Sequence, residues 1–366
     1  MAASLPSEAL LLLEDGSLFR GEAVSPGTRF GEVVFNTSMT GYQEILTEPS
    51  YRGQIVVMTQ PHMGNYGTGD LLAESRRPWV EAFVARNFTA HPSGHPGGEA
   101  LPAWLRRHGV PAMAGIDTRA LVRRLRHRGA LRGVLTSERS DVRALAAELA
   151  DFPAMTGRAL VEEVSCEAPW VVPAEGEEEL RLAVYDFGVK ENILRSLARR
   201  GARLTVLPAS TPAATALQAG PDGVVLSNGP GDPQPLAGIV DNVRQILEAR
   251  RPLLGICLGH QLVGLALGGA TFKLKFGHHG GNQPVRRVDD GRVAITSQNH
   301  GFAVDAESLP EGVRASELNL NDGTVEALEL AGRPVLSVQY HPEAAPGPHD
   351  AAPLFDRFLA LCREAR

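Results

Sequence analysis

The chain has few cysteines and no long apolar run. Only Cys166, Cys257 and Cys362 occur among 366 residues, and their spacing suits neither a disulfide framework nor a metal site. No apolar stretch approaches the roughly 20 residues of a transmembrane helix. The apolar run 9–13 has no basic region before it and meets an acidic turn at once, so we expect a first strand there and not a signal peptide. These absences favour a protein of the reducing cytoplasm that works without a membrane.

Lysine is also scarce, and acidic residues outnumber basic residues. The net charge of −6 and the isoelectric point near 6.0 give no electrostatic reason to expect nucleic acid or an anionic membrane as a partner. Among the 36 basic residues only Lys190, Lys273 and Lys275 are lysines, and the others are arginines. The hydrophobic content of 43% and the charged content of 21% are those of an ordinary globular protein, and the length allows two domains.

A nucleophile elbow is predicted at Gly255-Ile256-Cys257-Leu258-Gly259. An apolar strand precedes it and a helix follows, so Cys257 would lie in the tight turn between them. The helix N-terminus favours thiolate over thiol, and the Leu258 amide would point toward a developing oxyanion. An isolated cysteine is more often a buried core residue. The flanking glycines make the nucleophile as plausible as a core cysteine. A base and its orienting group elsewhere in the sequence would decide between the two interpretations.

A base and its orienting group are predicted at His341 and Glu343. His341 follows the predicted strand 336–340, so it would emerge at the same sheet edge as Cys257. Glu343 would then fix the imidazole tautomer and stabilise the imidazolium ion. A His-x-Glu sequence alone is weak evidence, because any exposed loop can contain one. Combined with an elbow in a parallel sheet, it indicates a Cys-His-Glu triad.

Two polar segments are predicted beside this triad. The loop Ser227–Pro233 leaves a strand and lacks the Lys-Ser/Thr of a phosphate loop. It is either only a sharp turn or, if it lies beside the elbow, a source of main-chain amides for a second oxyanion donor. Gln298–Phe302 is expected after a strand, where it either offers polar groups to a substrate or forms a simple hairpin turn. His278 and His279 do not indicate a metal site, because neighbours in a strand point to opposite faces and no further ligand stands at suitable spacing.

The predicted pattern of helices and strands changes once along the chain. Mixed strands and helices extend over residues 1–165, residues 166–179 form an acidic linker with proline and glycine, and strands alternate with helices over 180–366. This alternation predicts an α/β fold with a mainly parallel sheet covered by helices on both faces. In the first domain, residues 118–128 are predicted to form a helix. Its five arginines make either a solvated face or a partner-binding face.

With these motifs established, residues 180–366 resemble the class I glutamine amidotransferases. The likeness rests on GICLGHQ at Gly255–Gln261, SNGPGDP at Ser227–Pro233 and QYHPEA at Gln339–Ala344. Four further motifs are similar to the small-subunit family of carbamoyl-phosphate synthase, and the likeness then covers essentially the whole chain. These motifs are FNTSMTGYQEILTEPSY at 35–51, GIDTRALVRRLR at 115–126, KFGHHGGN at 275–282 and QNHGF at 298–302.

The resemblance implies a glutaminase with a swivelling β/β/α-like first domain. It implies that Cys257 forms a γ-glutamyl thioester, that His341 is the general base and acid, and that Glu343 orients His341. The residues implied to bind L-glutamine are Ser38, Gly229, Gly231, Leu258, Gln261, Asn299, Gly301 and Phe302. Ser38 comes from the first domain, and a glutamine site between the domains would explain why that domain is needed.

A large synthetase subunit is the implied partner. Ammonia would pass to it through an interior tunnel, and it would make carbamoyl phosphate from bicarbonate and two ATP for arginine and pyrimidine synthesis. ATP with Mg would therefore belong to the partner, and no cofactor or metal is implied on this chain. We expect a heterodimer or an oligomer of heterodimers, in the cytoplasm, that binds neither nucleic acid nor membrane.

Two departures from the family pattern and three alternatives complete the analysis. Gln283 stands where histidine is expected, and Ala345 stands where serine often occurs, but neither is a position of the triad or of glutamine binding. The alternatives are a glutaminase component of another synthetase, a free amidohydrolase and a catalytically silent regulatory scaffold. Because all three lysines fall in or beside family motifs, we also expect them to serve partner contact or loop support that arginine cannot provide.

Overall fold

The computed structural model describes residues 8–94 and 98–366, which divide into two compact units. Unit 1 contains the chain up to Met155 together with Lys275–His279, and unit 2 contains Thr156–Leu274 and Gly280–Arg366. The predicted boundary after residue 165 is therefore too late. The predicted linker 166–179 is also wrong, because it lies inside unit 2 and contributes strand β10 (Trp170–Val172), which pairs with β12 (Ala202–Pro208).

Unit 1 is built on a closed barrel with the strand order β1-β2-β8-β6-β4-β3-β9. Alternate residues of a strand serve different cores. Val33 packs in one cluster with Leu121 and Leu125 of helix α3, whereas Val34 packs in another with Tyr42 of α1 and Trp104 of α2. The barrel strands are β1 (Glu8–Leu13), β2 (Leu18–Ser25), β3 (Thr28–Asn36), β4 (Gln54–Met58), β6 (Ala82–Val84), β8 (Ala112–Ala114) and β9 (Leu131–Thr136).

The other elements of unit 1 are short. The strands β5 (His62–Met63) and β7 (Asn87–Phe88) form a small parallel pair. The helices are α1 (Tyr42–Thr47), α2 (Leu101–Arg107), α3 (Thr118–Arg128) and α4 (Val142–Asp151). The bounds predicted for the arginine-rich helix are confirmed, since α3 begins at Thr118 with the Asp117 carboxylate accepting a hydrogen bond from the Ala120 amide.

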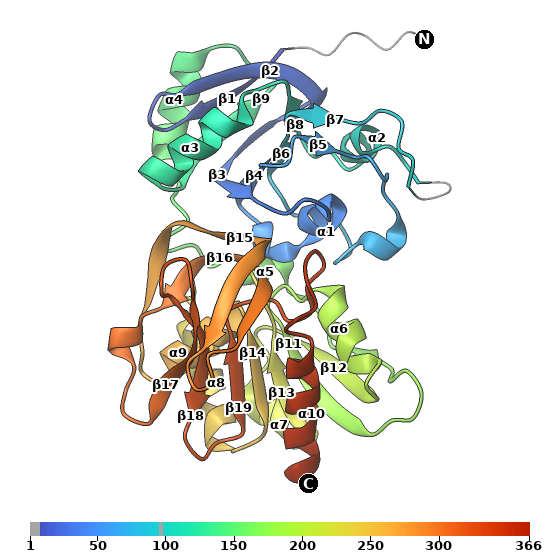
Figure 1. The fold of residues 1–366 in the computed structure, drawn as a ribbon, viewed down its shortest axis with the longest axis vertical. Helices are drawn as coiled ribbons and strands as arrows, with labels where there is room; N and C mark the ends of the chain where they lie inside the picture. Colours follow the sequence, from blue (N-terminus) through green and yellow to red (C-terminus); the bar gives the residue numbers. More distant parts are fainter. Residues whose placement is uncertain (1–7, 95–97) are drawn as a thin grey trace. The chain divides into compact units, whose positions relative to one another are not determined.

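Unit 2 is an α/β unit around a ten-stranded sheet with the order β10-β12-β11-β13-β14-β19-β18-β17-β15-β16, whose strands other than β10 are labelled in Figure 1. Pairing is parallel from β12 to β19 and antiparallel from β19 through β18 and β17 to β15. The predicted parallel sheet is thus confirmed for one half of the sheet. The remaining strands are β11 (Leu180–Asp186), β13 (Gly223–Leu226), β14 (Leu253–Ile256), β15 (Thr271–Arg287), β16 (Val293–Val304), β17 (Val313–Asn319), β18 (Val325–Leu330) and β19 (Val335–Val338).

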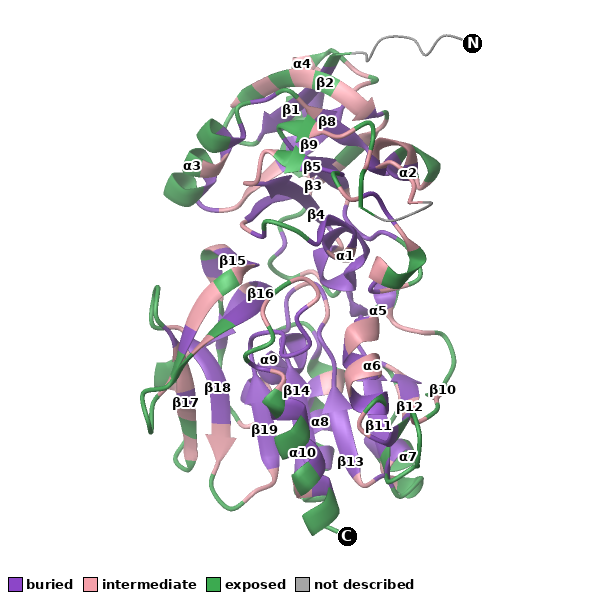
Figure 2. Ribbon diagram, turned by 45° about the vertical axis from the view of Figure 1, so that its right-hand side comes forward, coloured by how far each residue is buried: buried purple, intermediate pink, exposed green. Residues whose placement is uncertain are grey.

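Helices cover both faces of the parallel half. α6 (Glu191–Ala198) and α10 (Pro353–Glu364) pack in one buried cluster, and α7 (Ala213–Gln218), α8 (Ala237–Glu248) and α9 (Leu258–Ala266) pack in another. The short α5 (Val161–Val164) adds Val161 to the second cluster. Figure 2 shows β13, β14 and β19 buried, as expected for strands enclosed on two sides. Within the described ranges the longest helices have 12 residues, well short of what a bilayer crossing requires.

The antiparallel half differs from the prediction. Gln298–Phe302 was expected to follow a strand, but it lies inside β16, which continues to Val304. The hairpin-turn interpretation of this segment is therefore wrong. Its polar side chains are tolerated in a strand because they are buried in a hydrogen-bonded network, described below.

Candidate active site

Cys257 occupies a strained turn between β14 and α9. Its φ of 53° and ψ of −103° lie in a region that L-residues rarely adopt, and the side chain is 2% exposed. The Cys257 amide donates to the Val338 carbonyl oxygen of β19 at 2.9 Å, which fixes the turn against the neighbouring parallel strand. Its Sγ lies 3.6 Å from the Asn299 carbonyl oxygen of β16. Cys257 therefore lies between the end of β14 in the parallel half and strand β16 of the antiparallel half.

The glycines on each side of Cys257 permit this turn. A Cβ at Gly259 would lie 2.2 Å from the Leu226 carbonyl oxygen, and a Cβ at Gly255 would lie 2.9 Å from the Gly259 carbonyl oxygen. No other residue type fits either position without moving backbone. The elbow has the strand–turn–helix geometry that its sequence predicts.

His341 lies three residues beyond the end of β19, which pairs with β14. Its amide donates to the Ser297 carbonyl oxygen at 2.8 Å, and its Nδ1 lies 2.7 Å from Glu343 Oε1. The carboxylate accepts the Nδ1 proton, so the lone pair of the neutral imidazole is on Nε2. Both side chains are buried. This is the arrangement of a base with its orienting group.

Lys190 is a buried residue that the sequence did not assign to the site. Its side chain is 1% exposed, and Nζ lies 3.0 Å from Glu343 Oε1 and donates to the Ala344 carbonyl oxygen. Burial alone would raise the pKa of Glu343, but the Lys190 ammonium and His341 together lower it to about 2. Glu343 is therefore ionised throughout the physiological pH range. The only feature of the sequence that could have singled out Lys190 is that lysine is rare in this chain.

The loop after β13 lies beside the elbow. A Cβ at Gly229 would lie 2.2 Å from the Phe187 carbonyl oxygen and 2.8 Å from Leu258 Cδ2, so this position accepts only glycine. Gly231 has a φ of 89°. Asp232 holds the loop through its carboxylate, which accepts the Gly157 amide at 2.8 Å. The loop and the Leu258 amide at the N-terminus of α9 are thus placed close together, as an oxyanion site requires.

Four predicted glutamine-binding residues are joined through α9 and β16. Gln261 Nε2 donates to the Phe302 carbonyl oxygen at 2.8 Å, and the Asn299 carbonyl oxygen faces Cys257. Gly301 lies on β16 between Asn299 and Phe302. Lys273 Nζ lies 4.9 Å from the centre of the Phe302 ring, a cation–π contact. The structure therefore brings these residues to the neighbourhood of the elbow.

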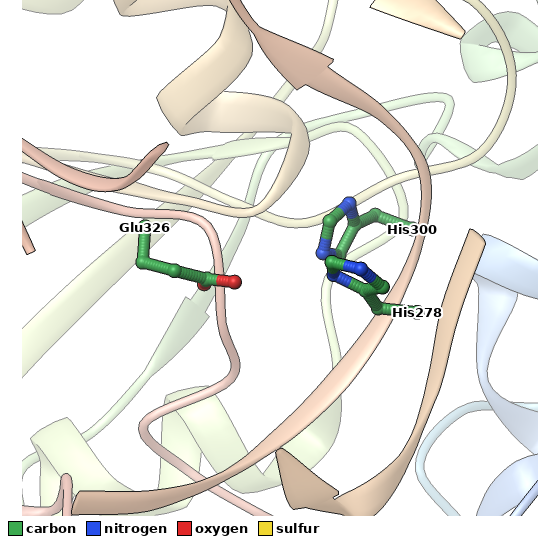
Figure 3. A group of neighbouring side chains, drawn as sticks. All are labelled: His278, His300 and Glu326. Carbon is green, nitrogen blue, oxygen red and sulfur yellow. The ribbon is translucent and has the colours of Figure 1, made fainter. Parts of the chain in front are cut away.

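A buried polar network supports this stretch of β16, and sequence reasoning missed it. His300 Nδ1 lies 2.8 Å from the Phe302 carbonyl oxygen and its Nε2 lies 2.9 Å from Gln298 Oε1. Gln298 Nε2 donates to Glu326 Oε1 at 2.8 Å, and Asn319 Nδ2 donates to the same oxygen at 2.8 Å. Because both nitrogens of His300 are engaged by protein groups, the arrangement favours a hydrogen-bonded network over a metal site. Figure 3 shows His300 and Glu326 with His278 of β15.

Ser38 belongs to unit 1 and follows β3. It is 7% exposed, and its amide donates to Asn36 Oδ1 at 2.7 Å. The Asn36 Nδ2 in turn donates to the Tyr51 hydroxyl at 2.8 Å. Within the described residues the Ser38 hydroxyl has no hydrogen-bond partner. Its backbone is therefore fixed while its hydroxyl keeps its hydrogen-bonding capacity.

Comparison with known proteins identifies the family. The family model described as carbamoyl-phosphate synthase small chain, CPSase domain, matches residues 11–135, and that described as glutamine amidotransferase class-I matches residues 183–361. The carbamoyl phosphate synthase small chain of Syntrophotalea carbinolica is 49% identical over 98% of this chain and 99% of its own length. That of Thioalkalivibrio sulfidiphilus is 50% identical over 97% of each chain, and that of Escherichia coli is 48% identical over 98% of each. The chain therefore belongs to the family of carbamoyl-phosphate synthase small chains, the glutamine-hydrolysing subunits of that enzyme.

Proposed function

We propose that Cys257 is the nucleophile for glutamine hydrolysis, with His341 as base and acid and Glu343 as its orienting group. The observation that carries this proposal is the strained Cys257 turn tied to β19, the strand that leads to the His341–Glu343 pair 2.7 Å apart. Cys362 has no comparable setting, since it lies inside helix α10, where burial raises the pKa of its thiol to about 12.

The proposed chemistry proceeds in two steps. His341 takes the proton of the Cys257 thiol, and the resulting thiolate attacks the side-chain carbonyl of glutamine. The oxyanion is stabilised by the Leu258 amide and the loop containing Gly229 and Gly231. Protonated His341 then gives its proton to the departing nitrogen, which leaves as ammonia, and a γ-glutamyl thioester remains. His341 next takes a proton from water, which attacks the thioester and releases glutamate.

The substrate contacts are part of the same proposal. Gln261, Asn299, Gly301 and Phe302 would hold the polar ends of glutamine, and Ser38 would be a further contact. The chain would need no cofactor for this reaction. Ammonia would pass to a large chain that uses bicarbonate and ATP with Mg to make carbamoyl phosphate, in a cytoplasmic heterodimer or an oligomer of heterodimers.

Glutamate release tests the proposal. The purified chain would be assayed alone and with a carbamoyl-phosphate synthase large chain, ATP and bicarbonate, beside Cys257→Ser. We expect slow release by the chain alone, strong stimulation by the large chain and loss of both in the variant. Fast release that does not respond to the large chain would instead indicate a free amidohydrolase. Absence of release in every condition would contradict a catalytic role.

A further inference from the structure

The outward face of helix α3 in unit 1 carries a row of arginines. Arg119, Arg123 and Arg126, called the arginine row below, are all exposed. Their spacing of four and then three residues places them one above the other along the helix. The opposite face, with Leu121 and Leu125, is buried in the barrel cluster. The row therefore faces away from the core of its own unit.

The chain does not neutralise the arginine row. In residues 8–94 and 98–366 none of the three guanidinium groups forms an ion pair or hydrogen bond, whereas Arg124 of the same helix pairs with Asp15 at 2.7 Å. Like charges at this spacing destabilise a helix. Arg119 also stands in the first turn, near the positive end of the helix dipole, where a cation is unfavourable. The stability of α3 therefore does not explain these residues.

Lys275 extends the positive surface at the end of α3. The Ala130 amide, just beyond the helix, donates to the Lys275 carbonyl oxygen at 2.7 Å. A Cβ at Gly129 would lie 3.6 Å from Lys275 Cγ, so the lysine stem runs beside the helix end. Lys275 is exposed and, in the part of the chain that the structure describes, has no ion pair. Thus one of only three lysines joins the same surface.

We propose that the arginine row and Lys275 form a docking surface for a carboxylate-rich face of the synthase large chain. This inference rests on the proposed function, which supplies the partner. The chain carries a net charge of −6, so a positive surface of this extent runs against its overall balance and fits an acidic partner. Guanidinium groups suit this role because each can bind a carboxylate through two parallel hydrogen bonds.

The test measures the affinity and association rate of the full chain for the purified large chain. The variant is Arg119→Gln/Arg123→Gln/Arg126→Gln. The matched control, Arg29→Gln/Arg143→Gln/Arg251→Gln, removes the same charge from exposed positions elsewhere. We expect the variant to bind roughly 10- to 100-fold more weakly, mainly through slower association that responds less to salt, while the control changes less than about 2-fold. Lys275→Gln should add a smaller loss.

Three further results decide the matter. Equal affinity of the variant and the control would overturn the docking surface, while the proposed function would stand if the wild-type chain still binds and responds to the large chain. Failure of the wild-type chain to bind would contradict the proposed partner itself. Wild-type self-association that the variant abolishes would assign the surface to a second copy of the chain and overturn the inference. Unchanged circular dichroism and unstimulated glutaminase activity of the variant show that it is folded.

Discussion

The two halves of the ten-stranded sheet build the site by different means. The parallel half supplies Cys257, held at a positive φ, and the buried charged pair of Glu343 and Lys190. The antiparallel half supplies the network of His300, Gln298 and Glu326, in which one carboxylate is shared by two amide donors. Backbone strain and a buried ion pair are thus concentrated around the proposed nucleophile and base, and hydrogen bonds between polar side chains are concentrated around the proposed substrate-binding strand.

The difference between the two halves reflects the stability costs of strain, buried charge and buried polar groups. A strained residue or a buried charge costs stability, and it persists only where the surrounding structure fixes it. A hydrogen-bonded polar network costs less and favours one geometry. We therefore expect changes in the parallel half to alter turnover and acid stability, and changes in the antiparallel half to alter substrate affinity.

The largest effect is expected at Cys257. Cys257→Ala should lower glutaminase turnover by at least about 10³-fold, because no other group can form the thioester. Cys257→Gly should be equally inactive but more stable than Cys257→Ala by about 1 kcal/mol, because glycine adopts the positive φ without strain. Denaturant unfolding measures the difference. Equal stability of the two variants would show that the turn is not strained.

The second effect concerns the charge on Glu343. Glu343→Gln keeps the shape but removes the charge that stabilises imidazolium, so turnover should fall about 10²-fold. The pKa of about 2 lies below the ordinary 4.5, so the ionised pair contributes stability that is present above pH 4.5 and is lost as the pH falls toward 2. The stability difference between wild type and variant, followed by denaturant unfolding, should shrink over that window. A pH-independent difference would contradict the assignment.

The third effect is at Lys190. Lys190→Met leaves the Glu343 carboxylate buried without its cation, so the chain should lose about 3 kcal/mol of unfolding free energy. The pKa of Glu343 should rise, and acid unfolding should begin at a higher pH. The control is Lys275→Met, at an exposed lysine, which should change the unfolding free energy by less than about 0.5 kcal/mol. Equal losses of unfolding free energy in both variants would show that Lys190 does not stabilise the Glu343 carboxylate.

The smallest effect on turnover is expected in the antiparallel half. Gln298→Leu breaks the link between His300 and Glu326, so the Phe302 segment should lose its fixed position. We expect KM for glutamine to rise about 10-fold while kcat changes less than about 3-fold. Steady-state kinetics of Gln298→Leu beside Gln298→Glu, which keeps an acceptor for His300, measures the split. A fall in kcat without a change in KM would break the contrast between the two halves.

Short sequence patterns predicted those elements of the fold that depend only on neighbouring residues. The elbow around Cys257 and the helix Thr118–Arg128 follow from glycine placement and helical spacing, and the structure has both. The Cys257–Asn299 contact and the Lys190–Glu343 pair join residues far apart in the sequence, so no local pattern contains them. The small number of lysines in the sequence drew attention to Lys190 but did not identify its partner, Glu343.

The antiparallel half was less predictable for a specific reason. β15 contains three glycines and alternates poorly between apolar and polar residues, and β16 buries Gln298, Asn299 and His300 in a strand. Such residues normally indicate a turn or a loop. Their strand conformation depends on hydrogen-bond partners from β18 and α9, which only the assembled sheet provides.

The central claim is that Cys257 carries the covalent chemistry, and one measurement tests it directly. The wild-type chain would be mixed with glutamine, quenched in acid during turnover, digested and examined by mass spectrometry. We predict a glutamyl group in thioester linkage on the peptide containing Cys257, absent from Cys257→Ser and cleaved by hydroxylamine. Glutamate release at the wild-type rate with the adduct on Cys166 or Cys362, or with Cys257 replaced by alanine, would contradict the account.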